Sequence, residues 1–376
     1  MSGGKCFGYV DMSEPYGEFT GRSPERVGEF SEVMFDGRWI GPHGIGRFAT
    51  EVLRRLPGAS SYDGDRPFFL TPLDPVLSSF RIRQRRPAVY FTPGFNPPIF
   101  SRMPFVVTLH DLIHLSIPEE GSVLKNAFYE QIVKPALFRA FRVLTVSGWS
   151  KGKILEWSGL PEERVVVVGN GVGGDFSPVG DRYMPGFPYF LYVGNRKPHK
   201  NLPFLMAAFS KARLPSSVKI AFSGDPDERT IFGIRECNLQ DRVVFLGELS
   251  DAALASSYRG ALALLFPSRI EGFGLPVLEA LACGTRVLAS RIPAVEEVAG
   301  TSARLLSPDD PEEWSRALEE VSDFVVGRSG DRSGDGGGES SDPIREAGIV
   351  RARLYSWNAV GERVGAVLRQ AMKAKG

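Results

Sequence analysis

The residues best suited to chemistry lie in four segments, and the richest of these is PSRIEGFGLPVLEALACG, residues 267–284. Its glycine-rich loop carries Glu271, and Pro276 fits the first position of a helix that Gly284 would end. Glu279 then lies in the opening turns of that helix. A carboxylate there can accept hydrogen bonds from sugar or ribose hydroxyls, while free backbone amides bind phosphate or carboxylate oxygens. Helix capping is the structural alternative for either glutamate.

A strongly cationic loop, VGNRKPHKN at residues 193–201, lies between an apolar run and a helical segment. It contains Arg196, Lys197 and Lys200. These are side chains that a diphosphate needs, because arginine can bind oxyanions in a bidentate manner and lysine supplies a compact charge. A solvated basic loop is the alternative.

Two weaker segments lie in the first half of the chain. GPHGIGRF, residues 41–48, is a glycine-rich turn before a helix, and such a turn exposes N–H groups to an anion. Its glycine order differs from the dinucleotide pattern, and a tight turn that needs glycine explains it equally well. His110 and Asp111 follow the apolar run 105–109, where ligands of parallel sheets gather. A purely structural histidine is the alternative there.

The elements that must position these residues are short apolar runs alternating with amphipathic stretches. Continuous apolar character is typical of parallel strands that are covered on both faces. The expected strands are 33–35, 68–70, 89–91, 105–109, 143–146, 165–168, 189–193, 219–222, 243–246, 263–266 and 286–289, and the expected helices include 46–56, 201–212, 251–259 and 276–283. The sequence therefore predicts a β-α-β rhythm that is repeated twice.

A proline- and glycine-rich seam, SPVGDRYMPGFP at residues 177–188, divides the two repeats. We therefore expect one domain over residues 1–180 and a second over 185–342. The segment 327–342 has too few apolar residues to order itself, which predicts a mobile loop. Residues 343–374 again have a helical pattern.

The composition excludes several classes of protein. Hydrophobic residues make up 43% and charged residues 24%, which is typical of globular chains. The 45 Lys and Arg against 44 Asp and Glu predict no general attraction to nucleic acid. Three distant cysteines (Cys6, Cys237 and Cys283) indicate neither a disulfide framework nor a zinc cluster. Without a membrane-length apolar run or a signal-peptide core, the expected location is cytoplasmic.

Taken together, these segments resemble the family 4 retaining glycosyltransferases, which have the GT-B fold. The spacing Glu271-x7-Glu279 within EGFGLPVLEALACGTRVLAS resembles the signature of this family. The resemblance as a whole extends over about residues 32–322. Other segments that resemble the family, in family order, are GIGRFATEVLRRL, YFTPGFNPP, VVTLHDLIHLSIPEE, LTVSGWSKGKI, VVVVGNGVGGDFSP and FLYVGNRKPHKNL.

The resemblance implies an α/β fold in which two Rossmann-like domains face each other across a cleft. The nucleotide-sugar donor would lie mainly on the C-terminal domain, residues 185–342, and the acceptor mainly on the N-terminal domain, residues 1–180. The last segment, residues 343–376, would be a C-terminal helix that crosses back to the N-terminal domain. Residues 1–31 precede the usual first strand, and we assign no purpose to them.

The resemblance also implies roles for single residues. Glu271 and His110 would contact the donor sugar and serve catalysis, and Glu279 would bind the ribose. Lys200 would hold the diphosphate. Further donor contacts are implied for Gly46, Phe273, Gly274 and Leu275.

One position departs from the family pattern. Many members have arginine directly after the glycine of the cationic loop, where this chain has Asn195. Arg196 follows it, and we expect Arg196 to take over the same contact with the donor.

The implied reaction is transfer of a hexosyl unit with retention of configuration. Negative charge builds on the departing diphosphate, and Arg196, Lys200 and the glycine-rich loop would stabilise it without a metal or other cofactor. The form VGNRKPHKN resembles mannosyltransferases of surface polysaccharide synthesis and favours GDP-mannose, while UDP-glucose and UDP-N-acetylglucosamine stay open. A GT-B-type epimerase or phosphorylase, or a non-enzymatic nucleotide-sugar-binding subunit, is the alternative.

The acceptor implied by the resemblance is a glycan or a lipid-linked glycan. Four arginines in RIRQRR, residues 81–86, can meet an anionic membrane surface, so association with the inner face of the membrane stays open. An exposed helix or loop face is the alternative for this run.

Overall fold

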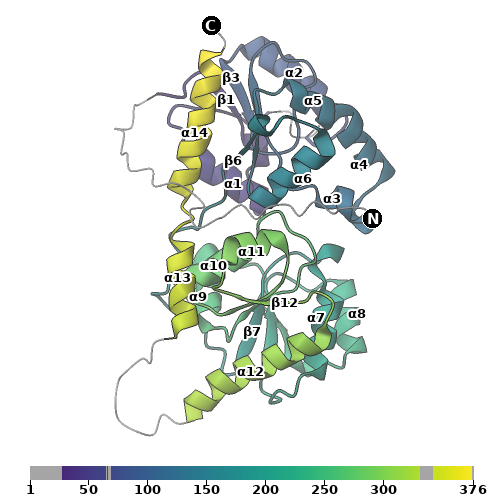
Figure 1. Ribbon diagram of the computed structural model, residues 1–376, viewed down its shortest axis with the longest axis vertical. Coiled ribbons are helices and arrows are strands. Elements are labelled where there is room, and N and C mark those ends of the chain that lie inside the picture. Colours follow the sequence, from purple (N-terminus) through teal and green to yellow (C-terminus); the bar gives the residue numbers. More distant parts are fainter. Residues whose placement is uncertain (1–27, 65, 67–68, 331–341, 375–376) are drawn as a thin grey trace, which may run out of the picture.

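The computed structural model describes residues 28–64, 66, 69–330 and 342–374. Residues 1–27, which form most of the N-terminal segment without an assigned purpose, lie outside this part. Two parallel six-stranded sheets, one above the other in Figure 1, organise the described chain. The predicted fold class, α/β with two Rossmann-like domains, is therefore confirmed. We call the unit around the first sheet the N-terminal domain and the unit around the second the C-terminal domain.

The first sheet has the strand order β2-β1-β3-β4-β5-β6. Along its inner strands, alternate side chains enter two separate cores, one on each face. Phe35 and Val106 pack on the face that α1 (Gly44–Leu53) and α14 (Trp357–Lys373) cover. Met34 and Val107 pack on the opposite face with α5 (Lys134–Arg139) and α6 (Gly148–Ser158). The strands are β1 Val33–Asp36, β2 Ser60–Tyr62, β3 Val89–Thr92, β4 Phe105–Thr108, β5 Arg142–Thr145 and β6 Val165–Val167. The helices are α1 Gly44–Leu53, α2 Asp74–Arg85, α3 Ile113–Ser116, α4 Val123–Phe128, α5 Lys134–Arg139 and α6 Gly148–Ser158.

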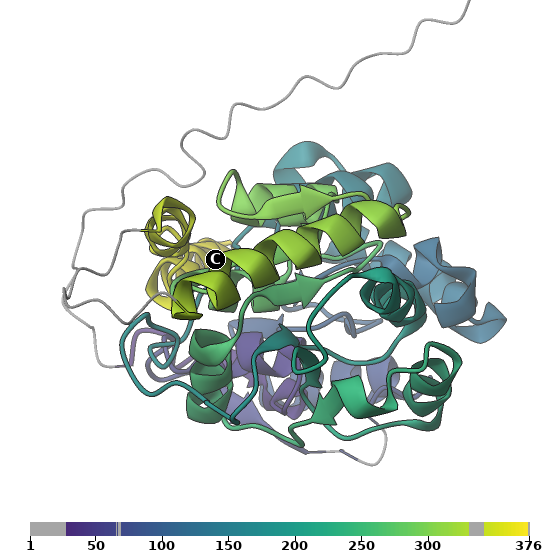
Figure 2. The same cartoon turned by 90° about the horizontal axis from the view of Figure 1, so that it is seen from below.

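The second sheet has the strand order β12-β11-β10-β7-β8-β9. Its strands are β7 Tyr189–Tyr192, β8 Lys219–Phe222, β9 Val243–Phe245, β10 Leu264–Phe266, β11 Val287–Ser290 and β12 Arg304–Leu306. Its helices are α7 Leu202–Lys211, α8 Glu228–Glu236, α9 Asp251–Gly260, α10 Leu275–Ala282, α11 Pro293–Ala299 and α12 Pro311–Gly330. Figure 2 shows α12 running across the side of this domain that is turned away from the N-terminal domain.

Two sequence predictions about local structure are wrong. The expected strand 68–70 is not formed at its described residues, because Phe69 and Leu70 lie in a turn and the edge strand is β2. The expected loop 327–342 begins too early, because α12 continues to Gly330. Residues 331–341 of that loop lie outside the described part.

The C-terminal segment forms two helices, α13 Pro343–Ala352 and α14 Trp357–Lys373, where the sequence pattern indicated one. Helix α13 stays on the C-terminal domain, where Arg351 donates to the carbonyl of Val298 at 3.0 Å. Helix α14 crosses back, and its side chains Trp357 and Val364 are buried in the same core as Phe48 (Figure 1).

Candidate active site

The loop that carries Glu271 is held by the N-terminal domain. Ser147 and Ser150, at the start of α6, donate from their hydroxyls to the carbonyl of Gly272 at 2.6 and 3.1 Å. A Cβ atom on Gly272 would lie 2.6 Å from the carbonyl oxygen of His110, so the close approach requires glycine here. The carboxyl ends of β4 and β5 therefore meet the loop after β10, and the segments of His110 and Glu271 come together.

Lys200 and Glu271, two predicted site residues, form a direct ion pair. The Lys200 ammonium lies 2.6 Å from a carboxylate oxygen of Glu271, and both side chains are largely buried. Lys200 follows β7 and Glu271 follows β10, which are neighbours in the sheet, so the strand order brings them together. The ammonium also lies 5.4 Å from the centre of the Phe266 ring. The pair forms a preorganised, poorly hydrated site for charge.

Glu279 is buried and is bound from both domains. Tyr258 donates to its carboxylate at 3.0 Å, and Arg47 of α1 forms an ion pair with it. Arg47 also bonds Asp251 of α9, and its guanidinium lies 5.4 Å from the centre of the Phe176 ring. Burial raises the pKa of Glu279 to about 7, although the Arg47 charge and the Tyr258 hydrogen bond act to lower it.

The sequence analysis missed Arg47, Tyr258 and Asp251. For Arg47 a signal was available, because it directly follows Gly46 in the glycine-rich turn. Neither Tyr258 nor Asp251 stands in a recognisable motif. Tyr258 reaches Glu279 because α9 packs beside α10, and Asp251 at the start of α9 pairs with Arg47.

The glycine-rich turn faces the start of α10. A Cβ atom on Gly44 would lie 3.9 Å from a methyl group of Leu275, in the other domain. The Gly46 amide donates to Nδ1 of His43 at 2.9 Å, and a Cβ atom on Gly46 would lie only 2.1 Å from the carbonyl oxygen of Gly41. The turn itself therefore requires glycine at position 46, and it places Gly44 against the start of α10.

Phe273, Gly274 and Leu275 form the start of α10. Gly274 adopts a left-handed conformation with φ 101° at the N-cap, and the Phe273 ring is buried against Tyr355 with centroids 5.8 Å apart. Pro276 has no N–H, and the Val277 amide donates to the carbonyl of Gly274 at 3.0 Å. This helix start can therefore offer only the amides of Phe273, Gly274 and Leu275 to an anion, as the resemblance implies.

His110 has a defined proton position. Its Nε2 bonds the carbonyl of Pro93 at 2.8 Å, and its ring meets Phe48 edge-on with centroids 5.0 Å apart. Because a carbonyl only accepts, Nε2 carries the hydrogen and Nδ1 keeps the lone pair. Burial lowers the pKa of His110, so the ring is neutral at pH 7 and can accept a hydroxyl hydrogen bond through Nδ1.

Arg196 is bound by backbone carbonyls and by a carboxylate. Its guanidinium donates to the carbonyls of Gly194 and Ser223, each at 2.9 Å, and lies 3.4 Å from a carboxylate oxygen of Asp227. It also lies over the ring of Phe222, 5.5 Å from its centre. Carbonyls that follow β7 and β8 therefore bind Arg196, while Lys200 bonds Glu271.

Further contacts join the domains around this site. Glu297 of α11 accepts from the amides of Gly148 and Trp149 at 2.8 and 3.1 Å, so a C-terminal carboxylate caps an N-terminal helix. Glu120 of the N-terminal domain accepts from the His199 amide at 3.1 Å and also bonds its ring. Within the described residues, no three His, Cys, Asp or Glu side chains gather so that they could hold a metal ion.

Comparison with known families identifies both domains. Residues 38–174 match the family model described as Glycosyltransferase Family 4, and residues 184–323 match the model described as Glycosyl transferases group 1. Both models describe glycosyltransferases, and the chain belongs to the family 4 glycosyltransferases, which have the GT-B fold.

Two similar relatives are O-antigen chain mannosyltransferases. The chain is 26% identical to O-antigen chain mannosyltransferase B of Escherichia coli over 252 residues. This aligned region covers 63% of this chain and 66% of that protein. It is 32% identical over 218 residues to RfbU of Salmonella typhimurium, which covers 57% of this chain and 60% of that protein. The chain thus spans less than two thirds of the length of either relative.

Solved structures with the same fold are more distant in sequence. The Anabaena protein HepE, solved with UDP and glucose, gives a TM-score of 0.67 at 15% identity over 90% of this chain and 99% of that one. Sucrose-phosphate synthase of Thermosynechococcus elongatus gives a TM-score of 0.62 at 20% identity, over 84% of this chain and 81% of that one. Across the described ranges, no helix is both long and apolar enough to cross a bilayer.

Proposed function

We propose that this protein transfers a hexosyl unit from a nucleotide-diphosphate sugar to a glycan or lipid-linked acceptor, with retention of configuration and without a metal ion. The observation that carries the proposal is the buried Lys200–Glu271 pair beside the start of α10, with Glu279 in the same helix. A cation, two carboxylates and helix amides thus lie within one site between the domains. Family membership supports the same reaction class.

In this proposal the enzyme's main task is to stabilise the departing diphosphate. Lys200 supplies a charge that is already positioned, and the amides of Gly274 and Leu275 at the start of α10 supply further donors, so no metal is needed for this role. Glu271 shares the ion pair with Lys200 and meets the donor sugar as positive charge develops on it. His110 accepts a sugar hydroxyl hydrogen bond through Nδ1.

The ribose of the donor competes with Arg47 for Glu279. In the free protein Arg47 pairs with the Glu279 carboxylate. When the donor binds, its ribose hydroxyls donate to this carboxylate in place of Arg47. Arg47 keeps Asp251 as its second carboxylate. The Arg47 guanidinium, next to Gly46, would then face the diphosphate that Gly46 is expected to contact.

The proposed donor is GDP-mannose. Two similar relatives bear the name of mannosyltransferases, and the loop VGNRKPHKN has the form already noted for such enzymes. The same relatives support an acceptor in O-antigen-type polysaccharide synthesis. A lipid-linked acceptor of that kind would place the reaction in the cytoplasm at the inner face of the membrane.

Steady-state kinetics of Glu271→Gln and Glu279→Gln test the assignment. An interaction made only in the transition state changes turnover, whereas one made equally in the ground state changes the Michaelis constant. Glu271→Gln should lower turnover about a hundredfold, which corresponds to roughly 2.7 kcal/mol. Glu279→Gln should mainly raise the Michaelis constant for the donor. The opposite pattern would show that the two roles are wrong.

The same assay separates the remaining alternatives. Transfer should persist in excess EDTA, and proton NMR of the product should report the donor's anomeric configuration. Activity that needs an added divalent ion, or an inverted product, would contradict the mechanism. Conversion of the donor without an acceptor would indicate an epimerase, and binding without turnover would indicate a non-enzymatic subunit.

A further inference from the structure

The loop after β3 carries the carbonyl that fixes the proton position of His110. Strands β3 and β4 are parallel neighbours in the first sheet, so the residues that follow them meet at its carboxyl edge. His110 follows β4, and its Nε2 donates to the carbonyl of Pro93 at 2.8 Å. The position of this one carbonyl therefore decides which ring nitrogen of His110 carries the hydrogen and which keeps the lone pair.

The hydroxyl of Thr92 forms a clamp around Pro93. This buried hydroxyl accepts from the indole Nε1 of Trp39 at 3.1 Å. It also accepts from the amide of Gly94 and donates to the carbonyl of the same residue, each at 3.4 Å. The Gly94 backbone packs directly against the indole, since a Cβ atom on Gly94 would lie 2.2 Å from the Trp39 ring. We define Trp39, Thr92 and Gly94 as the Pro93 clamp.

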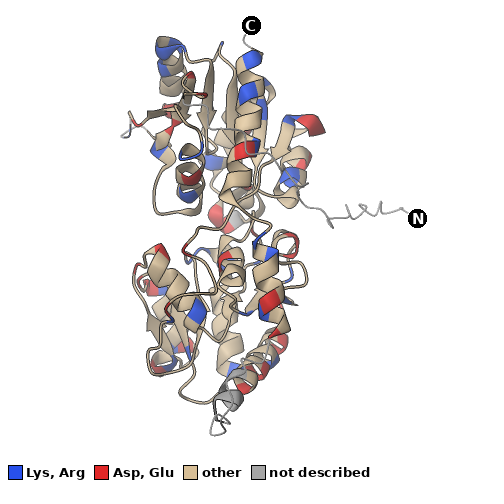
Figure 3. Cartoon of the chain, turned by 90° about the vertical axis from the view of Figure 1, so that its left-hand side faces the viewer, with Lys and Arg blue, Asp and Glu red and all other residues tan. Residues whose placement is uncertain are grey.

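The other end of this loop is held by a buried cluster of Arg38, Asp36 and Asp74, the Arg38 cluster. The Asn96 side chain is buried and bonds the carboxylate of Asp74, to which Arg38 donates at 2.6 Å. Figure 3 shows charged residues mainly on helices and loops, and in the described strands Asp36 is the one charged residue that is buried. Buried charges require partners in a fixed geometry. The cluster is therefore a rigid anchor for Asn96.

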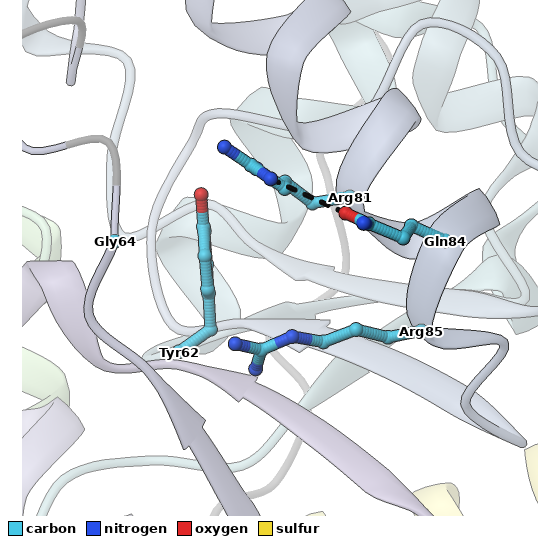
Figure 4. Close-up of a pocket in the computed structure, with 5 residues that line it drawn as sticks. All are labelled: Tyr62, Gly64, Arg81, Gln84 and Arg85. Carbon is cyan, nitrogen blue, oxygen red and sulfur yellow. Dashed lines mark hydrogen bonds between the residues drawn. The ribbon is translucent and has the colours of Figure 1, made fainter.

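The Tyr62 ring lies between the Arg38 cluster and solvent. The Arg38 guanidinium lies 5.0 Å from the centre of this ring and is completely buried. The ring also lines an open cavity of about 520 Å³ on the flank of α2, together with Gly64, Arg81, Gln84 and Arg85 (Figure 4). Water that fills the cavity meets Tyr62 instead of the buried charges. The attraction between Arg38 and its carboxylates is therefore strong, because it acts in a medium of low dielectric constant.

We propose that Trp39 and Thr92 are positioning residues for glycosyl transfer. Through the Pro93 clamp they hold the Pro93 carbonyl on Nε2 of His110, and they thereby keep the lone pair of Nδ1 available to a hydroxyl of the donor sugar. Neither residue touches the substrate in this proposal. The inference rests on the proposed function, because the role of His110 in the reaction belongs to that function.

The orientation of the lone pair affects the transition state more than the ground state. Positive charge develops on the sugar during transfer, and hydrogen bonds that its hydroxyls donate become stronger as it does so. The Nδ1 lone pair can accept such a bond, whereas an N–H at the same place cannot. In the ground state a hydroxyl can either donate or accept, so it tolerates both ring forms. The clamp should therefore act on turnover and leave the affinity for the donor nearly unchanged.

A clamp that only stabilises the fold is the alternative, and two other residues allow the comparison. Thr145 ends β5 as Thr92 ends β3, and both are fully buried. Among the described residues, however, the Thr145 hydroxyl has no hydrogen-bond partner. Trp314 lies in the C-terminal domain, and its Nε1 donates to the carbonyl of Ser307 at 2.9 Å. It therefore forms a buried indole hydrogen bond that does not involve the loop after β3.

Steady-state kinetics of three clamp variants test the proposal. Thr92→Val removes the hydroxyl at similar shape and should lower turnover about tenfold, the change that one hydrogen bond typically makes. Its Michaelis constant for the donor should change by less than about twofold. Thr92→Ser keeps the hydroxyl and should retain turnover within about twofold of the unmodified protein. Trp39→Phe removes the indole N–H but keeps a ring beside Gly94, and it should lower turnover about threefold.

The matched controls are Thr145→Val and Trp314→Phe. Both should keep turnover within about twofold of the unmodified protein, because neither residue contacts the clamp or His110. Trp314→Phe also removes a buried indole hydrogen bond, so it reports what a loss of stability alone does to turnover. Circular dichroism should show that every variant is folded at the temperature of the assay.

Heteronuclear NMR of protein with labelled histidine tests the ring form without any substrate. The chain has four histidines, and the spectrum of His110→Gln identifies which signals belong to His110. In the unmodified protein these signals should be those of a ring with its hydrogen on Nε2. In Thr92→Val they should shift toward the values of a mixture of both ring forms, and in Thr145→Val they should stay in place.

Several results would overturn the proposal while transfer itself is intact. These are equal turnover of Thr92→Val and Thr145→Val, a loss in Thr92→Ser as large as that in Thr92→Val, and His110 signals that Thr92→Val leaves unchanged. A raised Michaelis constant with unchanged turnover in Thr92→Val would overturn it too. Failure of the proposed function has a different signature. A protein without transfer activity whose His110 signals still shift in Thr92→Val would contradict the transfer reaction and support the hold of the clamp on His110.

Discussion

Two arginine–carboxylate clusters in this protein differ in where their partners come from. Arg38 bonds Asp36 at 2.7 Å and Asp74 at 2.6 Å, and all three side chains are completely buried within the N-terminal domain. Arg47 bonds Glu279 and Asp251, both of which belong to the other domain. The Arg47 side chain is 27% exposed and that of Asp251 is 48% exposed.

The Arg38 cluster is a structural network, whereas in the Arg47 cluster we propose that a ligand replaces Arg47 at Glu279. The Arg38 cluster has additional partners, since Tyr90 donates to Asp36 at 2.8 Å and Arg38 donates to Ser78 at 3.1 Å. Burial alone would lower the pKa of Arg38, but its bonds to the carboxylates raise it, so the charge is permanent. In the Arg47 cluster, Arg47 and Asp251 are partly exposed to water, Glu279 is buried, and the members come from two domains. We therefore propose that a ligand which donates hydrogen bonds to Glu279 takes the place of Arg47.

The largest effect is expected from Arg38→Met, which leaves two buried carboxylates without their cation. Removing one member of a buried ion pair costs about 3–5 kcal/mol. Urea unfolding followed by circular dichroism should report a loss of this size. Arg54→Met is the control, because Arg54 is 68% exposed and pairs with Glu51 on the surface of α1. The control should lose less than about 1 kcal/mol. Equal losses would mean that burial does not distinguish these pairs.

Lys200→Ala should have the next largest effect, this time on ligand binding. A charge-assisted hydrogen bond contributes about 1.5–3 kcal/mol, so the affinity for a nucleoside diphosphate should fall by that amount. The affinity for the bare nucleoside should change little, because Lys200 is proposed to contact only the diphosphate. Isothermal titration calorimetry with both ligands measures the difference.

Arg196→Ala serves as the comparison, since the carbonyls of Gly194 and Ser223 already bind this guanidinium. Its diphosphate-specific loss should be much smaller than that of Lys200→Ala. Equal losses for the two ligands in Lys200→Ala would contradict the phosphate assignment. A larger diphosphate-specific loss in Arg196→Ala would instead support the original expectation that Arg196 replaces the arginine missing at Asn195.

The fold was predictable from the sequence wherever strands are buried on both faces. Val89 and Leu288 belong to such strands, and their apolar runs are unambiguous. Of the edge strands, β6 and β9 were predicted, because their sequences VVV and VVF stay apolar even though they are only partly buried. The edge strands β2 and β12 escaped, because β2 has the polar sequence SSY and β12 begins with the exposed Arg304. Polar residues at these two edges remove the apolar signal on which the prediction depends.

The candidate site was predictable where both partners follow neighbouring strands of one sheet. Lys200 and Glu271 follow strands of one sheet, and their meeting requires only the strand order. The contact of Arg47 with Glu279 depends on how two domains pack, which no local pattern records. The contacts of Arg196 with the carbonyls of Gly194 and Ser223 likewise depend on how the loops after β7 and β8 lie together, which its position in the motif does not record.

The smallest expected effect is a pH dependence of donor binding that arises from Glu279. Its pKa of about 7 means that roughly half of the carboxyl groups are protonated at pH 7 in the free protein. Ribose hydroxyls would favour the ionised form, which accepts their hydrogen bonds, so donor affinity should rise with pH and level off above this pKa. Between pH 7 and pH 8 the expected gain is about twofold. Calorimetry across this range measures it.

Two variants test whether Glu279 is the group responsible. Glu279→Gln should abolish the pH dependence, and Arg47→Gln should move its midpoint to higher pH, because it removes the cation that favours the carboxylate. Arg54→Gln, on the same helix, should leave the midpoint in place.

The free energy of unfolding should also depend on pH through Glu279, but in the direction opposite to that of donor affinity. The folded pKa of Glu279 lies above its ordinary value of 4.5, so the folded state holds an extra proton between pH 4.5 and about 7. The contribution of this group to the free energy of unfolding therefore falls as pH rises through that window. Glu279→Gln has no carboxylate to ionise, and it should gain stability relative to the unmodified protein from pH 5 to pH 8. If the two proteins keep a constant difference across this range, Glu279 does not titrate near neutrality, and its partner exchange with Arg47 cannot depend on its protonation.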